Sequence, residues 1–275
     1  MALTYPEFDP VALQIGPVAI HWYGLSYALT FTVGLFLISR LLETPRLWGD
    51  RSRQGLAPKL DTLMAYLVLG VLIGGRLGHI LFYKLGYYLA NPLEILAVWN
   101  GGMSFHGGFI GTVIGILLFS RRHSVDKWLV ADLIAVTAPI GIFLVRMANF
   151  VNGEIIGSRS SAPWAMVFPG YAEPRHPAML YEAALEGLLL FGVIAYGIFR
   201  LKLLQRQRMA TGIFLLGYGT TRIFVEFFKF ADHRMIVPDL PITRGMALSV
   251  PMLVCGIWLL ATQLRAGALK PSDTK

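Results

Sequence analysis

The chain has 275 residues, of which 55% are hydrophobic and only 15% charged, so a soluble domain, with its usual ~25% charged residues, is excluded. The formal charge of +8 does not indicate nucleic-acid binding, because the basic residues lie in short clusters between apolar runs, as is typical of membrane topology. The single cysteine, Cys255, excludes an internal disulfide and a cysteine-rich metal site, and its apolar surroundings predict a packing or lipid-facing role.

The N-terminal segment lacks the features of a cleaved signal. Residues 1–17 contain no Lys or Arg, whereas a secretory signal peptide begins with a positively charged region. We therefore expect the first apolar span to be retained as an anchor.

Seven apolar runs follow along the chain. A helix that crosses ~30 Å of hydrocarbon at ~1.5 Å per residue needs about 20 residues. The sequence thus predicts an all-α, polytopic integral membrane protein with about seven transmembrane helices, forming one membrane-embedded domain over residues 1–275. The predicted spans are residues 19–39, 62–83, 103–120, 129–151, 178–199, 210–229 and 246–264. The connection at 152–177 contains four prolines and is predicted to form a rigid excursion rather than a helix.

The distribution of Lys and Arg predicts the orientation of the spans. Of the 24 basic residues, 15 lie in the connections 40–60, 121–127 and 200–208 or in the C-terminal tail, six lie on the opposite side, and three lie inside spans. The positive-inside rule then places the C-terminus in the cytoplasm and the N-terminus outside. The excursion at 152–177 is expected on the outer side.

Polar residues end the fourth span, in the segment VRMANFVNGEIIGSR at 145–159. Arg146, Asn149, Asn152 and Glu154 would lie at or inside the lipid boundary, where a charge at a helix centre costs about 2.5–3.5 kcal/mol. Two explanations are open: the polar residues sit among lipid headgroups at the helix end, or they face a cavity or a partner.

Charged residues in other spans favour the second explanation. Arg76 and Arg222 also lie within apolar runs, and Tyr218, Glu226 and Lys229 are spaced from Arg222 so that they share one helix face. A single intramembrane arginine could be a structural clamp. Three arginines, with a histidine and two asparagines at similar depth, predict a buried site near the outer leaflet.

The residue types of this site predict phosphate or carboxylate binding, because arginine pairs with both through two parallel hydrogen bonds. His106 lies between two glycine pairs in GGMSFHGG, so it is a candidate general base; alternatively, it only holds the loop through a hydrogen bond. Metal-binding histidine spacings, a nucleophile elbow, a P-loop and a dinucleotide motif are missing from the sequence. We therefore expect no metal and no cofactor, and a nucleophile supplied by a substrate.

Six segments resemble the bacterial phosphatidylglycerol–prolipoprotein diacylglyceryl transferase family over almost the whole chain. They are IHWYG at 20–24, GGRLGH at 74–79, WNGGMSFHGG at 99–108, RMANFVNGEIIG at 146–157, HPAMLYE at 176–182 and YGTTRIFVEFF at 218–228. The resemblance implies a seven-helix enzyme of the bacterial inner membrane. Such an enzyme transfers the diacylglyceryl group of phosphatidylglycerol to the lipobox cysteine of a prolipoprotein signal peptide, forming a thioether and releasing glycerol phosphate.

The resemblance also implies roles for individual residues. Arg146 and Arg222 would hold phosphatidylglycerol and its departing phosphate, and His106 would accept the proton of the incoming thiol. Glu154 would orient either an arginine or the glycerol hydroxyls. The remaining candidate substrate-binding residues are His21, Tyr23, Asn149, Asn152, Gly157, Tyr218 and Glu226.

Several positions depart from the family pattern. Val145 replaces a glycine, Ala178 and Met179 replace two polar residues, Lys229 replaces an arginine, and Met246 replaces a glutamine. These departures leave donor and prolipoprotein selectivity open. Two rival functions follow: a transporter, since intramembrane charges also mark solute paths, and an inactive relative that binds lipid or lipoprotein without turnover.

Overall fold

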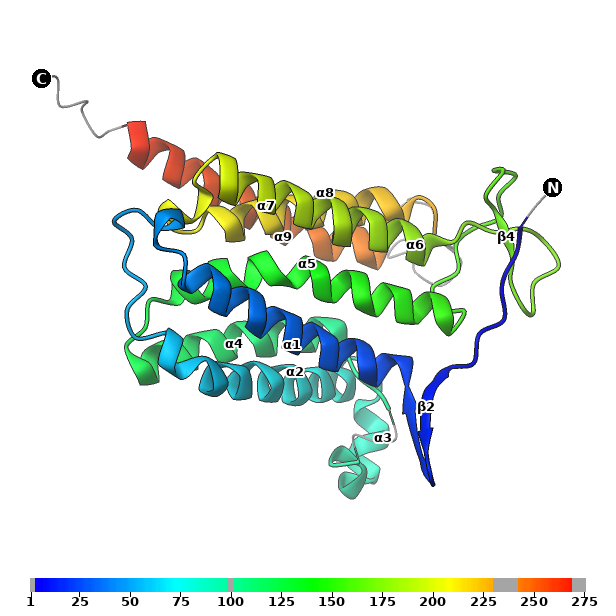
Figure 1. Cartoon of the computed structure of the whole chain (residues 1–275). Coiled ribbons are helices and arrows are strands. Elements are labelled where there is room, and N and C mark those ends of the chain that lie inside the picture. The colour runs from blue at the N-terminus through cyan, green and yellow to red at the C-terminus, as the bar shows by residue number, and fades with distance from the viewer. Residues whose placement is uncertain (1–2, 98–100, 230–241, 269–275) are drawn as a thin grey trace, which may run out of the picture. The chain divides into compact units, whose positions relative to one another are not determined.

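The computed structural model describes residues 3–97, 101–229 and 242–268, and the side chains of Val18, Phe105, His106, Arg244 and 266–268 lie outside this description. The described chain is mostly helical (Figure 1). It divides into two compact units, residues 1–51 with 132–275, and residues 52–131.

Every predicted span coincides with a helix or a run of helical segments. These are α1 (Trp22–Leu42), α2 (Leu60–Tyr83), α4 (Phe105–His123), α5 (Lys127–Val151), the run α6 (Ala178–Glu182), η5 (Ala183–Leu189) and α7 (Leu190–Arg200), α8 (Met209–Glu226), and α9 (Arg244–Ala268). Within the described residues, five are long and apolar enough to cross a membrane: Trp22–Leu42, Ala57–Tyr83, Lys127–Val151, Ala178–Arg200 and Gly245–Arg265. The structure therefore supports an all-α polytopic membrane fold, with α4 and α8 less apolar than the others.

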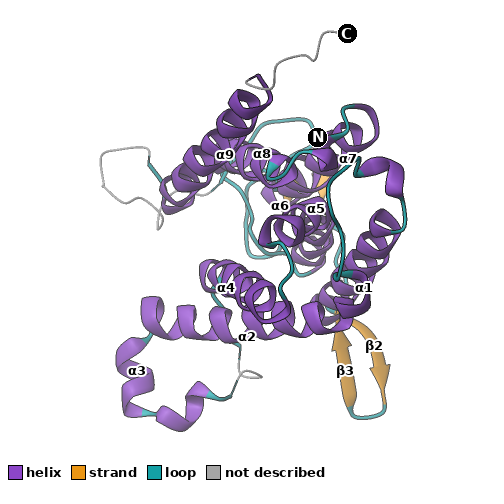
Figure 2. Cartoon of the chain, turned by 90° about the vertical axis from the view of Figure 1, so that its left-hand side faces the viewer, coloured by secondary structure: helices purple, strands orange, loops and turns teal. Residues whose placement is uncertain are grey.

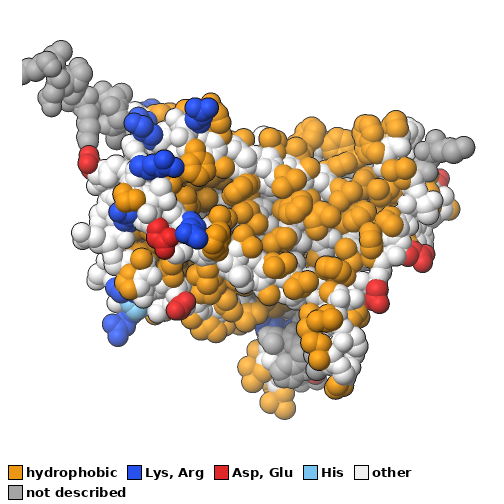
Figure 3. Space-filling model, in the orientation of Figure 1, with side chains coloured by type: hydrophobic (Ala, Val, Ile, Leu, Met, Phe, Trp, Pro, Cys, Tyr) orange, Lys and Arg blue, Asp and Glu red, His pale blue; other side chains and the backbone are white. Residues whose placement is uncertain are grey.

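Apolar side chains cover the outward faces of these helices, as Figure 3 shows for one face of the molecule. On α7, for example, Val193, Tyr196 and Phe199 are 47%, 62% and 63% exposed. Such exposure of large apolar side chains would favour aggregation in water, so these faces are suited to contact lipid.

Short elements connect or precede the helices. They are η1 (Pro45–Leu47), η2 (Ala57–Lys59), α3 (Leu85–Ala90), η3 (Pro92–Ile95) and η6 (Leu203–Gln205). Short strands, which the sequence did not predict, are also present. Before α1, β2 (Val11–Ile15) and β3 (Val18–His21) form an antiparallel hairpin, drawn in orange in Figure 2. Further strands, β1 (Leu3–Thr4) and β4 (Met166–Val167), pair in parallel.

In the unit of residues 52–131, α2 and α4 pack at backbone distance through glycines. A Cβ atom added to Gly111 would lie only 2.7 Å from the carbonyl carbon of Gly70 and 3.1 Å from the Cα of Gly74. Helices in lipid gain contact by such close approach, since apolar side chains are equally well accommodated by lipid tails.

In the other unit, α8 packs along α9 and α7 (Figure 1). The excursion at 152–177 contains β4 and irregular backbone but no helix, as its prolines predicted. A small apolar core of Tyr5, Phe168 and Met179 ties the N-terminal segment to this excursion and to α6. The Tyr5 hydroxyl donates to the carbonyls of Phe150 and Val151 at 2.5 and 2.9 Å, at the end of α5.

Candidate functional site

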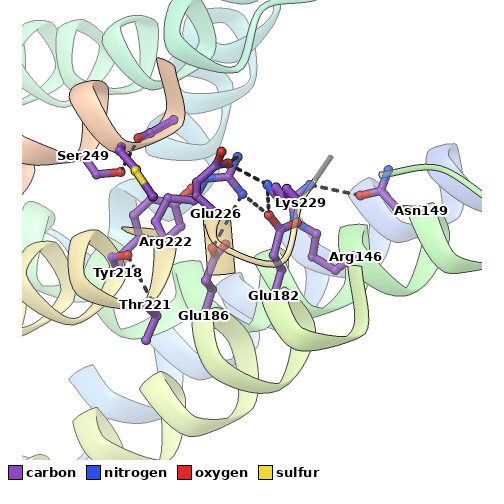
Figure 4. Close-up of polar contacts among 12 residues, drawn as sticks. Arg146, Asn149, Glu182, Glu186, Tyr218, Thr221, Arg222, Glu226, Lys229 and Ser249 are labelled. Atoms are coloured by element: carbon purple, nitrogen blue, oxygen red, sulfur yellow. Dashed lines mark hydrogen bonds and ion pairs between the residues drawn. The ribbon is translucent and has the colours of Figure 1, made fainter. Parts of the chain in front are cut away.

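One fully buried carboxylate, Glu182 at the end of α6, collects three cations from other elements. Its Oε2 lies 2.8 Å from Nε of Arg146 on α5, close in distance though not aligned as a hydrogen bond. Its Oε1 contacts Nη1 of Arg222 on α8 and Nζ of Lys229, which follows α8. Glu182 therefore connects α5, α6 and the C-terminal end of α8 through one side chain (Figure 4).

Glu226 provides a second counter-charge. Its Oε1 lies 3.2 Å from Nη2 of Arg222 and 3.1 Å from Nζ of Lys229, and its Oε2 accepts a hydrogen bond of 2.8 Å from Thr243. Gly245 is required beside this carboxylate, because a Cβ atom there would lie 2.5 Å from Glu226 Oε1. The spacing prediction for the face of α8 is borne out for Arg222, Glu226 and Lys229.

A chain of hydrogen bonds extends from Arg146 toward α1. Arg146 Nη1 donates to Asn149 Oδ1 at 3.1 Å, and Asn149 Nδ2 donates to Tyr23 and, at 3.0 Å, to Glu154. The Tyr23 hydroxyl donates to the same Glu154 oxygen at 2.5 Å. Glu154 thus contacts Asn149, which in turn contacts the guanidinium of Arg146, so the geometry is consistent with the first of the two roles, while both roles stay predictions.

The two arginines of this cluster are partly exposed, whereas Lys229 and the carboxylates are buried. The side chains of Arg146 and Arg222 are 15% and 19% exposed, while those of Glu182 and Glu186 are fully buried. We call the set Arg146, Glu182, Glu186, Arg222, Glu226 and Lys229 the ion-pair cluster. Buried carboxylates contact the guanidinium groups, and the exposed part of each arginine side chain is accessible to an anionic ligand.

The backbone of the helix that carries Glu182 departs from α geometry where the next acid follows. Glu186 lies within η5, a π-helical segment between α6 and α7. Gly187 in this segment packs against α5, since a Cβ atom there would lie 2.7 Å from Cβ of Phe143. Single π-helical turns inside α-helices are frequent at functional sites.

Gly157 and Tyr218 lie close to the cluster in different ways. Gly157 leaves no space for a side chain, because a Cβ atom would lie 2.5 Å from the carbonyl oxygen of Phe228 and 2.6 Å from that of His176. It therefore holds the excursion against the segment that follows α8. Burial lowers the pKa of His176, which lies at the end of the excursion. Tyr218 is buried on α8, one turn before Arg222.

The other predicted site residues lie outside the cluster contacts. Asn152 Oδ1 is buried and accepts no hydrogen bond from the part of the chain that the structure describes. His21 caps α1 and is exposed, with no contact to the ion-pair cluster among the described side chains. His106 lies in the first turn of α4, and its side chain lies outside the described residues.

A family model for prolipoprotein diacylglyceryl transferase matches residues 10–262. The chain belongs to this family. Curated relatives named phosphatidylglycerol–prolipoprotein diacylglyceryl transferase include one from Sinorhizobium medicae, 45% identical over 97% of this chain and 96% of its own length. Another, from Agrobacterium fabrum, is 46% identical over 93% of this chain and 92% of its own length. A third, from Brucella canis, is 44% identical over 97% of this chain and 96% of its own length.

Two sequence interpretations need correction for this transferase. Arg76 was grouped with the buried site, but its guanidinium donates to backbone carbonyls of residues 94–102, including those of Ile95 and Ala97 at 3.0 Å. It is therefore a structural clamp. His106 was treated as part of a loop between glycine pairs; instead, it lies in the first turn of α4, and the next residue, Gly107, packs on α2, where its Cβ would lie 2.9 Å from the Cα of Gly78.

Two acids and a lysine of the cluster were not among the predicted site residues. Glu182 and Glu186 are one turn apart inside an apolar run, which was the available signal, since intramembrane acids rarely lack a function. Lys229 was placed on the face of Arg222 and noted as a departure from the family, but it was not a candidate site residue; its ammonium group contacts both Glu182 and Glu226. The departures Ala178 and Met179 are fully buried, and Met179 packs in the small apolar core rather than at the cluster.

Proposed function

We propose that the chain transfers the diacylglyceryl group of phosphatidylglycerol to the lipobox cysteine of prolipoproteins. The names of relatives that match nearly the whole chain carry this proposal. The ion-pair cluster supports it independently, because two arginines with accessible sides suit a lipid phosphate. The partners are therefore phosphatidylglycerol, a prolipoprotein signal peptide and the surrounding bilayer.

The reaction forms one sulfur–carbon bond and breaks one carbon–oxygen bond. The cysteine thiolate attacks a glycerol carbon of the donor, and the phosphate ester leaves with the electron pair as glycerol phosphate. The thiol proton goes to an acceptor on the enzyme. Negative charge increases on the departing phosphate, so preorganised cations beside it lower the barrier.

Each candidate residue takes a role in this step. Arg146 and Arg222 bind the phosphate, while Tyr23, Asn149 and Glu154 hold Arg146 in place. His106 accepts the thiol proton. The residues Asn152, Gly157, Tyr218, Glu226 and His21 complete the proposed binding region, some by shaping the backbone and some by contact.

The proposed topology has seven transmembrane helices in one membrane-embedded domain of the bacterial inner membrane, with the N-terminus outside and the C-terminus in the cytoplasm. The charge bias of 15 against six basic residues supports this orientation. A periplasm-active reporter fused after Lys275 is expected to give no signal, and one fused within the excursion a strong one. The reverse pattern would place the excursion and the site on the cytoplasmic side and would contradict the proposed orientation.

A transfer assay tests the function directly. Purified chain in phosphatidylglycerol vesicles labelled in the diacylglyceryl group is mixed with a peptide that carries a lipobox cysteine, and the same peptide with serine is the control. Label on the cysteine peptide alone supports the transferase. Intact lipid-binding without transfer would indicate the inactive relative, whereas solute movement across the vesicle without transfer would indicate a transporter. Complementation of transferase-depleted cells provides the second test.

A further inference from the structure

Glu186 differs from the other carboxylates of the ion-pair cluster because no group in the described part of the chain donates a hydrogen bond to it. Its side chain is fully buried, and neither of its oxygens has a hydrogen-bond partner within the described ranges. The closest cation, Nη1 of Arg222, lies 3.7 Å from Oε1, beyond hydrogen-bond distance. Glu182 and Glu226, by contrast, are each contacted by two or three donors.

The cations around Glu186 are already engaged with these other acids. Arg222 contacts Glu182 through Nη1 and Glu226 through Nη2 at 3.2 Å. The described charged and titratable groups near Glu186 come from the same helix, from α5, from α8 and from the segment after α8 (Figure 4). They are Glu182, Arg146, Tyr218, Arg222, Glu226 and Lys229.

The backbone beside Glu186 is tightly packed. The π-helical segment that carries it packs on α5 at Gly187, where the backbone approach leaves no space for a Cβ atom. A buried carboxylate without donors is strongly unfavourable, whereas the same group carrying a proton is neutral and costs far less to bury.

We propose that Glu186 is the neutral member of the ion-pair cluster and acts as a specificity-determining residue for the donor lipid. Three cations then face two ionised carboxylates, and the buried cluster carries one net positive charge. Phosphatidylglycerol carries one negative charge on its phosphodiester, so charge balance is reached when it binds. A zwitterionic phospholipid, whose own ammonium group already balances its phosphate, would bring an additional cation to the cluster. This inference rests on the proposed function, because it assumes a phosphodiester ligand at Arg146 and Arg222.

The inference predicts a pH effect with a definite sign. As the pH rises, Glu186 loses its proton, the buried cluster becomes neutral, and affinity for the anionic donor falls. Glu186→Gln is neutral at every pH and cannot follow this change. The ratio of donor affinity, variant over wild type, should therefore rise about tenfold from about pH 6 to about pH 9. Zwitterionic phosphatidylethanolamine should show no such dependence.

The experiment uses the full chain in detergent micelles, with phosphatidylglycerol or phosphatidylethanolamine as the titrated lipid. Infrared difference spectra of the same samples report the C=O stretch of a protonated carboxylic acid, which should be present in the wild type and in Glu226→Gln but absent in Glu186→Gln. An affinity ratio that is constant with pH, or identical infrared bands in wild type and Glu186→Gln, would overturn the inference. If the wild type binds no phosphatidylglycerol at any pH, the proposed function and the donor-specificity role fail together, whereas the infrared band still decides the protonation of Glu186.

Discussion

Replacing Glu182 by Gln should be the most destabilising single change in the ion-pair cluster. The substitution keeps the size of the side chain but removes the charge that Arg146, Arg222 and Lys229 share. Breaking a buried ion pair by removing one partner costs about 3–5 kcal/mol, because the remaining charge stays buried without compensation. The structure also predicts where the loss originates: Arg222 and Lys229 keep Glu226, whereas Arg146 has no second carboxylate among its described contacts.

The matched control is Glu226→Gln. It removes the charge of another buried carboxylate in the ion-pair cluster, whose side chain is 1% exposed against 0% for Glu182. Both of its cationic partners keep Glu182, so the free energy of unfolding should fall by only about 1–3 kcal/mol. At roughly 2–4 °C per kcal/mol, the apparent Tm in detergent should drop by about 6–20 °C for Glu182→Gln and by about 2–12 °C for Glu226→Gln. The order of the two variants is the sharper prediction.

Added lipid separates an electrostatic cause from a packing defect. Phosphatidylglycerol should raise the Tm of Glu182→Gln more than that of the wild type, because its phosphate can replace the missing negative charge. Phosphatidylethanolamine at equal concentration is the control. Two results would contradict a shared counter-charge at Glu182. One is a Glu226→Gln variant that is less stable than Glu182→Gln. The other is a Glu182→Gln variant that melts within about 2 °C of wild type, which corresponds to roughly 1 kcal/mol or less.

Variants at four further positions test the chemistry. Arg146→Ala and Arg222→Ala should each abolish transfer. Lysine at either position should restore only part of the activity, because lysine keeps the charge but lacks the planar guanidinium that forms two parallel hydrogen bonds. Full activity with lysine at both positions would show that the arginines act only as general counter-charges. His106→Gln should bind phosphatidylglycerol but transfer about 10²–10⁴ times more slowly, with partial recovery at higher pH as the thiol ionises unaided. Weak donor binding without pH rescue would instead make His106 a positioning residue. Cys255→Ala should transfer normally, because this cysteine is exposed on the apolar helix α9; lost activity in a folded variant would contradict a substrate-supplied nucleophile.

The helices were predictable because each corresponds to a continuous apolar run in the sequence that is long enough to cross a membrane. The short strands were not. β1 and β4 have two residues each, and their pairing joins segments more than 160 positions apart, so no local pattern announces it. The two-unit division likewise depends on long-range contacts rather than on composition.

The candidate site was predictable in its residue types and only partly in its members. Arg146 and Arg222 stand out by the cost of charge in lipid. Arg76 carries the same cost, but backbone carbonyls bind its guanidinium, and this depends on where the chain places residues 94–97 and 101–102. Glu182 and Glu186 were visible in the sequence as two acids one turn apart. Only the structure shows that Glu182 is a counter-charge shared by several cations and that Glu186 has no hydrogen-bond donor among the described residues.

The pairing of β1 with β4 has a consequence for biosynthesis. Leu3 and Thr4 leave the ribosome first, but their partners Met166 and Val167 follow only after four of the long helices have been made. Until then the first strand has exposed backbone groups and Tyr5 lacks Phe168 and Met179. Closing a loop of this length is slow compared with forming helices from local contacts. The N-terminal strand is therefore ordered later than the helices α1 to α5, and its pairing cannot begin until the excursion at 152–177 has been made.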